Sequence, residues 1–194
     1  MKNLIQILTL VTVTILSIAP SHAAIISFSL DTASSEVQVG DSFDVDVIVH
    51  DLFANDLTDY LVAFGFNALY STDGLLAFTG STINPLFDDN SVNFGLNAAG
   101  WANEDITNDT VVGQTLTLAS LHFQALAAGN VSIFVNSELL DLNQGLTFLN
   151  QGQLAINNVS SNFSISAVPL PPALLIFISG LVGISFSAFR KRFV

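Results

Sequence analysis

Carboxylates and two histidines are the side chains of this 194-residue sequence with the widest range of chemistry. All 16 Asp and Glu residues lie between Asp31 and Asp141, and the same stretch contains His50 and His122. A histidine beside a carboxylate can act as a general base, and two carboxylates held a fixed distance apart can cleave a glycosidic bond. Spacing along the chain does not show which of these groups would share a cleft.

The motifs of common enzyme classes are absent from the sequence. It contains no Gly-x-Ser-x-Gly, His-Glu-x-x-His, phosphate-binding loop with lysine or Rossmann fingerprint. Residues 3–189 hold no lysine or arginine to bind a phosphate or stabilise an oxyanion, and the chain has no cysteine. His122 shares the polar side of a predicted strand with Ser120 and Gln124, which indicates a solvated or hydrogen-bonded histidine. We therefore expect a protein that is not an enzyme.

Clustered oxygen ligands indicate a second kind of chemistry, calcium binding. Hard oxygen donors suit Ca²⁺, which extracellular modules often bind weakly. No segment matches the twelve-residue helix-loop-helix pattern, and a solvated acidic face that keeps the protein soluble explains the same residues. Calcium is the only cofactor that we consider. Its candidate ligands, in segments predicted to be loops, are Asp88, Asp89, Asn90, Glu104, Asp105 and Asp109.

The single tryptophan and the charge balance limit the partners. Trp101 lies between Gly100 and Asn103 in a predicted loop, where it would either stack on a sugar ring or cap the end of the fold. Residues 24–167 carry 16 carboxylates and no lysine or arginine. Nucleic acid, phosphate-rich polymers and anionic lipid would be repelled by this charge. A protein surface or a neutral polysaccharide therefore remains as the partner.

Period-2 alternation predicts the elements that position these side chains. In residues 42–49 apolar residues alternate with polar ones, as in a half-buried antiparallel strand, and residues 62–69 form a central strand covered on both sides. A slip of apolar phase within residues 115–126 predicts a bulge near Ala119-Ser120. Many short strands at this spacing imply an all-β sandwich. Further strands are predicted at residues 25–30, 92–96, 131–135, 153–156 and 162–167.

This strand pattern resembles the cohesin family over most of residues 25–166. The resemblance is carried by Val39-Gly40-Asp41-Ser42-Phe43, the strand at 62–69 with its two phenylalanines, residues 118–125 before Ala128-Gly129-Asn130-Val131, and the closing Asp141-Leu142-Asn143-Gln144-Gly145. It implies a cohesin-like jelly-roll β-sandwich that binds protein partners through one sheet face, and related folds bind carbohydrate. The chain contains no duplicated dockerin calcium loop.

The N-terminus has the pattern of a secretory signal peptide over residues 1–23. Lys2 precedes an apolar stretch at residues 4–18, and small residues at Ser21 and Ala23 predict cleavage before Ala24. An uncleaved membrane anchor is the alternative, because residues 4–19 are almost long enough to cross a tilted bilayer.

The C-terminus has the pattern of a single transmembrane helix followed by three basic residues, which we call the basic stop. Residues 173–189 are uncharged, and as a helix they would span about 25 Å, slightly less than a typical hydrocarbon core. Arg190, Lys191 and Arg192 follow, and the positive-inside rule places these residues in the cytoplasm and residues 24–167 outside it.

Residues 168–194 also resemble the PEP-CTERM protein-sorting signal of Gram-negative bacteria in its VPLPA-type variant. The motif Val168-Pro169-Leu170-Pro171-Pro172 comes first, then the apolar helix with Ser179-Gly180-Leu181-Val182-Gly183, then the basic stop. Leu170 stands where the commoner form has Glu, and Pro172 where the variant has Ala. The resemblance implies recognition by an exosortase, a membrane-embedded cysteine transpeptidase-like enzyme, and release or transfer to the cell surface. An ordinary single-span anchor is the alternative.

Two functions follow from the sequence. The first is a non-catalytic surface or extracellular-matrix protein, sorted by an exosortase-like system, whose β-sandwich at residues 24–167 makes protein or matrix contacts. The second is a carbohydrate-binding or carbohydrate-modifying module of the exopolysaccharide layer. In both cases the protein is exported, is held at the inner membrane at least transiently by its C-terminal helix, and then reaches the cell surface or medium.

Overall fold

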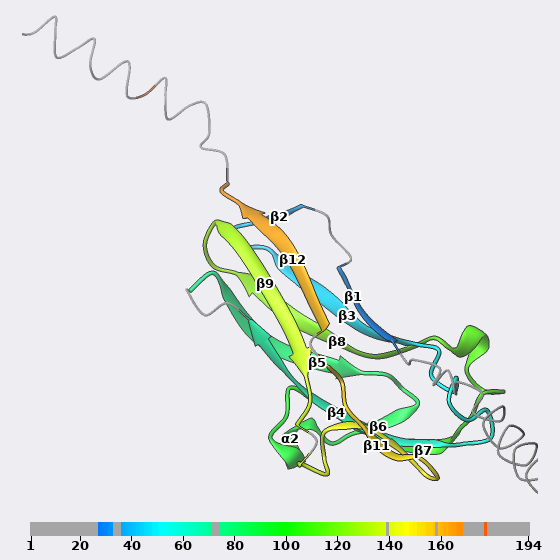
Figure 1. Ribbon diagram of the computed structural model, residues 1–194. Coiled ribbons are helices and arrows are strands. Elements are labelled where there is room, and N and C mark those ends of the chain that lie inside the picture. Colours follow the sequence, from blue (N-terminus) through cyan, green and yellow to red (C-terminus); the bar gives the residue numbers. More distant parts are fainter. Residues whose placement is uncertain are drawn as a thin grey trace, which may run out of the picture.

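The protein is an all-β sandwich of two antiparallel-rich sheets, as the sequence predicts (Figure 1). A computed structural model describes residues 27–32, 36–70, 74–138, 140–157, 159–168 and 177. The four-stranded sheet has the order β1 (Ser27–Thr32), β3 (Ser42–His50), β8 (Leu116–Ala125) and β5 (Leu76–Ile83).

The eight-stranded sheet branches at its central strand. Its main path is β11 (Gly152–Leu154), β10 (Gly145–Phe148), β4 (Leu61–Tyr70), β9 (Gly129–Asn136), β12 (Val159–Ser166) and β2 (Val37–Gln38). In its first half, β4 also pairs with β7 (Ala98–Ile106), and β6 (Phe87–Asp89) pairs with β7. The pair β12–β2 is parallel, and the other pairs of both sheets are antiparallel.

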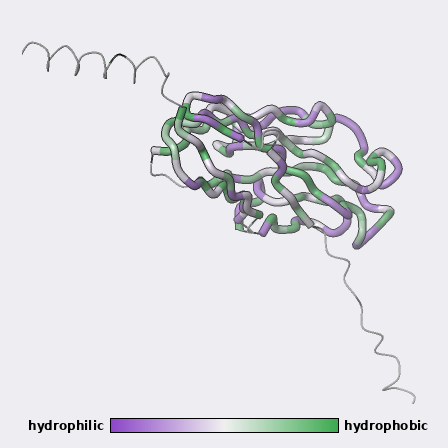
Figure 2. The backbone as a smooth tube through the Cα atoms, turned by 90° about the horizontal axis from the view of Figure 1, so that it is seen from above, coloured by the Kyte–Doolittle hydropathy of each residue, from purple (hydrophilic) through white to green (hydrophobic). Residues whose placement is uncertain are grey.

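Apolar side chains at alternate strand positions fill the space between the sheets. Phe43, Val45, Val47 and Val49 of β3 are buried, so the alternation predicted for residues 42–49 is confirmed. Phe123 of β8 is the centre of an aromatic cluster within this core. Figure 2 shows hydrophobic and hydrophilic segments interspersed along the chain.

The predicted bulge in β8 is present. Val47 pairs with Ala119 and Ile48 with Thr117, so Leu118 has no partner on β3. Leu118 and Ala119 are both buried, which shifts the alternation by one residue. As a result, residues 121 and 123 face the core, and residues 120, 122 and 124 face outward.

The strand predicted at residues 92–96 is wrong. Residues Ser91–Phe94 form the short helix α2 instead, with Val92 almost fully exposed. Asp89 Oδ1 accepts hydrogen bonds from the backbone N–H (2.9 Å) and the hydroxyl (2.6 Å) of Ser91, which begins the turn. Gly95 then adopts φ 67° and ends the helix in the left-handed conformation that glycine tolerates.

The loops predicted around residues 88–90 and 101–105 are also wrong over most of their length, because β6 and β7 run through them. Their polar side chains are exposed, and β6 is an edge strand. An edge strand exposes polar residues as a loop does, so composition does not separate the two. Strands β2, β5 and β10 were not predicted either.

Strand β4 is central, as predicted, but only part of it is covered on both sides. A side chain at Gly65 would lie 2.0 Å from the carbonyl oxygen of Asn143 and 3.0 Å from Leu96, so two loops pack directly against the backbone at this glycine. Val62 and Leu69, on either side of this contact, are exposed. The two-sided coverage therefore holds near Gly65 and fails at both ends of the strand.

Most of the N-terminal and C-terminal segments lies outside the residues that the structure describes. The predicted cleavage residues Ser21, Ala23 and Ala24 lie outside the described residues, as do Pro169–Pro172 and Arg190–Arg192. Val168 is described and exposed. Within the described part of the chain, no helix has the length and apolarity needed to cross a membrane.

Candidate binding surface

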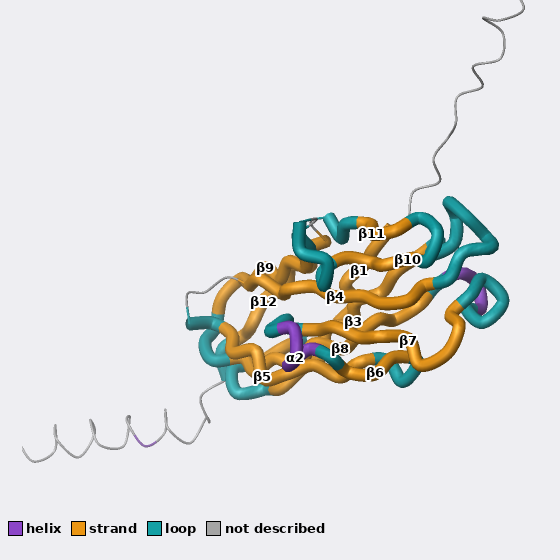
Figure 3. Tube along the Cα trace, turned by 90° about the horizontal axis from the view of Figure 1, so that it is seen from below, coloured by secondary structure: helices purple, strands orange, loops and turns teal. Residues whose placement is uncertain are grey.

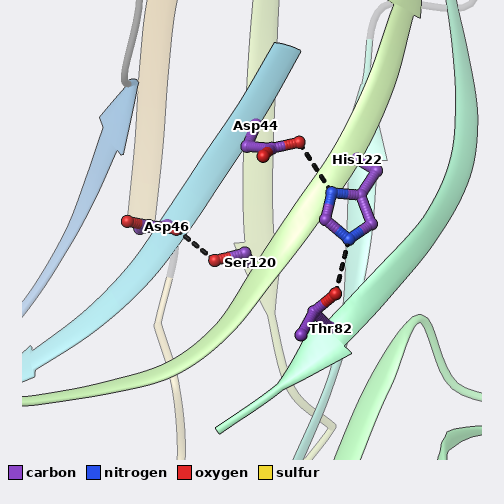
Figure 4. Close-up of polar contacts among 5 residues, drawn as sticks. All are labelled: Asp44, Asp46, Thr82, Ser120 and His122. Atoms are coloured by element: carbon purple, nitrogen blue, oxygen red, sulfur yellow. Dashed lines mark hydrogen bonds and ion pairs between the residues drawn. The ribbon is translucent and has the colours of Figure 1, made fainter. Parts of the chain in front are cut away.

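A chain of three polar side chains crosses the outer face of the four-stranded sheet (Figure 4). His122 of β8 lies opposite Asp44 of β3, and Nδ1 of the ring is 2.6 Å from Asp44 Oδ1. Nε2 of the same ring is 2.7 Å from Oγ1 of Thr82 on β5. Because an ionised carboxylate only accepts, the ring donates its Nδ1–H to Asp44, and in its neutral form it accepts the hydroxyl proton of Thr82.

The backbone register explains why this histidine reaches a residue that is not opposite it. On β5 the partner of His122 is Gly80, which has no side chain and has φ +150° beside a register shift. The ring therefore has room to lean toward Thr82, the next outward-facing position along β5. A larger residue at position 80 would occupy this space.

A second set of contacts runs parallel to the first. Asp46 of β3 lies opposite Ser120 of β8, and the Ser120 hydroxyl donates to Asp46 (Figure 4). On the other side of β3, Asp31 of β1 lies directly opposite Asp46. We call the set Asp31, Asp44, Asp46, Thr82, Ser120 and His122 the acidic face.

The second histidine is on the same sheet. His50 Nε2 is 2.7 Å from the Ser29 hydroxyl, and its Nδ1 is 3.4 Å from Oγ1 of Thr115. Both histidines lie on strands, as the sequence predicts, and both are hydrogen-bonded, which was expected only for His122 and there as an alternative to solvation. The outer surface of this sheet presents imidazole, hydroxyl and carboxylate groups that hold one another in place.

Asp44, His122 and Thr82 are ordered like the acid, base and nucleophile of a hydrolytic relay. The side chains of His122 and Asp44 are 33% and 55% exposed on an open sheet face. Hydrolysis by such a relay also needs oxyanion donors in a site that excludes water. Asp44 and His122 lie on an open sheet face, which does not exclude water.

The six candidate calcium ligands do not converge. Asp88 and Asp89 lie on β6, and Glu104 and Asp105 lie on β7. Asn90 is the N-cap residue of α2, and Asp109 lies in a turn after β7. Among the described residues, no group of three or more His, Asp or Glu side chains is placed to hold a metal ion. Calcium binding thus stays a prediction from the sequence.

Trp101 lies on β7 and not in a loop, and its side chain is 58% exposed. It therefore does not cap the end of the core, which was one of the two roles considered for it. Its ring contacts Phe94 of α2, with the ring centroids 6.1 Å apart. Figure 3 shows α2 near β6, the strand that pairs with β7.

A groove of about 460 Å³ lies between β4 and β7. Leu61 pairs with Ile106 and Ala63 pairs with Trp101, so four residues of β7, 102–105, stand opposite the single residue Val62 of β4 at this register shift. The groove is lined by Tyr60, Leu61, Val62, Ala102, Asn103, Glu104, Asp105 and Leu149. No local sequence pattern indicates this groove, because it depends on the pairing register between β4 and β7.

Two carboxylates are held by hydrogen bonds that sequence analysis did not identify. Asp59 is fully buried. Burial alone would raise its pKa, but hydrogen bonds from the backbone N–H groups of Asn150, Tyr60 and Gln151 outweigh it and lower the pKa below 3.8. The backbone N–H of Asn143 and the amide of Gln144 likewise lower the pKa of Asp141. These carboxylates stabilise turns and belong neither to the acidic face nor to the lining of the groove between β4 and β7.

Comparisons with known proteins show a similarity of fold to solved structures. No family model and no curated protein matches the chain. A type I cohesin–dockerin complex from Clostridium thermocellum matches at 12% identity and TM-score 0.46, covering 72% of this chain and 99% of that chain. A type II cohesin domain from the cellulosome of Acetivibrio cellulolyticus matches at 14% identity and TM-score 0.40, covering 74% and 92%. AvmM, which catalyses macrocyclisation in alchivemycin A biosynthesis, matches at 10% identity and TM-score 0.36, covering 76% and 92%. At identities and TM-scores this low, the likeness assigns no family, partner or activity.

Proposed function

We propose that this chain is a non-catalytic, exported surface protein that binds a protein partner through the acidic face of its four-stranded sheet. The observation that carries the proposal is the ordered array of Asp44, His122 and Thr82, three side chains from three strands held in one hydrogen-bonded chain. An array that is ordered before binding loses little side-chain entropy when a partner docks, so its hydrogen bonds contribute more to affinity.

Charge indicates which kind of protein surface would fit. Asp31 and Asp46 are directly opposite each other, and like charges in this position destabilise a sheet. No lysine or arginine of residues 3–189 can neutralise them. A partner that presents lysine or arginine side chains would relieve this repulsion and would be attracted over a distance.

The binding prediction is tested with a double charge reversal. The full chain is used as bait for the extracellular and membrane fractions of its own cells, in parallel with the Asp44→Lys/Asp46→Lys variant and with Trp101→Ala. We expect a protein that binds the wild type and Trp101→Ala but binds the double variant at least about tenfold more weakly, since close charge pairs at interfaces contribute roughly 1.5 kcal/mol or more. Binding should also weaken as salt is raised.

Retention of the same partner by Asp44→Lys/Asp46→Lys, with an unchanged melting temperature, would contradict the role of the acidic face. A variant that loses secondary structure is replaced by Asp44→Asn/His122→Gln, which keeps similar side-chain size and hydrogen-bonding groups while removing the Asp44 carboxylate and the His122 imidazole.

Export and sorting form the second half of the proposal. The resemblance of residues 168–194 to an exosortase signal, together with the confinement of all four cations to Lys2 and residues 190–192, supports delivery to the cell surface. The processing enzyme and, at least transiently, the membrane are then partners of the terminal segment.

Sorting is tested by the intact mass of the mature protein recovered from cells. We expect an N-terminus at Ala24 and a C-terminus near Pro169–Pro172, because the tail would be cut at its motif. A mass that still includes Arg190, Lys191 and Arg192 would show an ordinary membrane anchor instead. This measurement does not depend on the acidic face, so the two halves of the proposal can fail separately.

A further inference from the structure

We infer that the outer face of the eight-stranded sheet around Trp101 is a binding platform for a neutral polysaccharide chain. This surface is on the other sheet from the acidic face, and it gives the predicted carbohydrate-binding role a definite location. Three observations carry the inference: an exposed tryptophan that contacts a second aromatic ring, a row of opposed residues through it that ends in a polar side chain on each side, and a groove that begins next to it.

Trp101 is exposed, and a neighbouring aromatic ring helps to fix the position of its side chain. Its side chain is 58% exposed, and the tilted contact with Phe94, at 49° between the ring planes, supports one side of the indole. An aromatic ring held on a strand presents a rigid apolar surface that loses little entropy on binding. The C–H face of a sugar ring is a complementary partner for such a surface, and its hydroxyls remain free for polar contacts.

The pairing register continues this surface across neighbouring strands. Trp101 is opposite Asp88 on β6 and Ala63 on β4, and Ala63 is opposite Thr147 on β10. Directly opposed residues project from the same face of a sheet, so these four residues form a row about 14 Å long at the usual strand spacing. Because the side chain of Ala63 is small, it projects less from the sheet than the neighbouring indole. Asp88 and Thr147 place a carboxylate acceptor and a hydroxyl at the two ends of the row.

The groove between β4 and β7 begins at the next residue of each strand. Val62 and Ala102 follow the Ala63–Trp101 pair and line the groove, whose volume of about 460 Å³ is in the range of small-ligand sites. Asn103, Glu104 and Asp105 line it as well, and their oxygens accept hydrogen bonds.

The chemistry of these groups favours a neutral sugar over other occupants. Glu104 and Asp105 need donors, and a sugar ring offers several hydroxyl donors, whereas an extended peptide offers one backbone N–H per residue. No lysine or arginine lies between residues 3 and 189, so an anionic polysaccharide would meet uncompensated carboxylates. The occupant is therefore an uncharged glycan.

Fluorescence reports on this platform directly, because Trp101 is the only tryptophan of the chain. The full chain is titrated with neutral hexasaccharides of β-1,4-glucose, α-1,4-glucose, β-1,4-mannose and β-1,4-xylose, with an alginate oligosaccharide as the anionic probe, and with a lysine-rich peptide as the cationic probe. We expect a saturable change in emission, and protection from acrylamide quenching, with at least one neutral probe and none with alginate. No response to any neutral probe would overturn the inference, as would a response confined to alginate or to a lysine-rich peptide.

Calorimetry on variants then locates the binding. We expect Trp101→Ala to weaken binding by up to about tenfold, since a well-placed aromatic contact contributes up to about 1.5 kcal/mol, and Trp101→Phe to retain most of the affinity. Glu104→Gln/Asp105→Asn should also weaken sugar binding, because these two carboxylates line the groove. The matched control is Phe134→Ala, a 42% exposed aromatic residue on β9 of the same sheet, which should bind like the wild type. Equal losses in Trp101→Ala and Phe134→Ala would overturn the inference.

The acidic-face variant separates this inference from the proposed protein binding. Asp44→Lys/Asp46→Lys should keep its sugar affinity, because both residues lie on the other sheet. Loss of sugar binding in that variant, with Trp101→Ala unaffected, would place the glycan on the acidic face and overturn the platform.

Discussion

Replacing Phe123 with alanine is expected to lower the free energy of unfolding by about 3–5 kcal/mol, the usual cost of deleting a buried phenylalanine ring. Phe123 is fully buried, and its ring centroid lies 5.8 Å from that of Phe43 and 5.6 Å from those of Tyr70 and Phe78. These partners come from β3, β4 and β5, so the ring joins both sheets. A cavity here would remove contacts with all of them at once.

Urea denaturation followed by far-ultraviolet circular dichroism measures this loss as a lower midpoint. Phe134→Ala removes the same ring from an exposed position and should cost less than about 1 kcal/mol. Because total stability is only about 5–15 kcal/mol for a domain, the Phe123→Ala protein should also melt well below the wild type. Equal midpoints for the two variants would contradict the position of Phe123 at the centre of the core.

The second large effect is expected at Asp59, where alanine should destabilise the protein by about 2–4 kcal/mol, because several N–H donors would lose their acceptor at once. The backbone N–H groups of Tyr60 and Asn150 donate to Oδ1 at 2.8 Å, and that of Gln151 donates to Oδ2 at 3.0 Å. One carboxylate thereby ties the start of β4 to the turn between β10 and β11. Asp59→Asn should have a smaller effect, since its single amide oxygen still accepts.

Asp59 should also make stability depend on pH. Its pKa is lowered in the folded state, so its contribution is fully present above the unfolded value near 3.8 and is lost as pH falls through the lower folded value. The wild type should therefore lose stability when acidified from pH 5 to pH 3, and Asp59→Asn should lose less. Urea midpoints at these two pH values test this. The same loss in both proteins would show that Asp59 does not contribute to acid sensitivity.

Local alternation was sufficient to predict several elements. The buried face of residues 42–49 and the bulge in β8 follow from the order of apolar and polar residues, because each position of a strand is committed to one face. The same logic placed His122, Ser120 and Gln124 outside. It failed at residues 92–96, where Val, Phe and Leu alternate but Asp89 and Gly95 impose a helical turn, and at β6 and β7, whose polar residues suggested loops.

The sequence by itself determined which side chains face the core in the regular strands, and its lack of lysine and arginine over residues 3–189 predicts that this stretch does not bind anionic polymers. The tertiary structure decided which outward side chains meet. Thr82 reaches His122 across 40 residues, Asp59 accepts from Asn150 across 91, and the groove beside Trp101 lies where the pairing of β4 with β7 shifts register. Such contacts depend on the register between strands that are distant along the chain, and that register is set by how the whole core packs, which no local pattern contains.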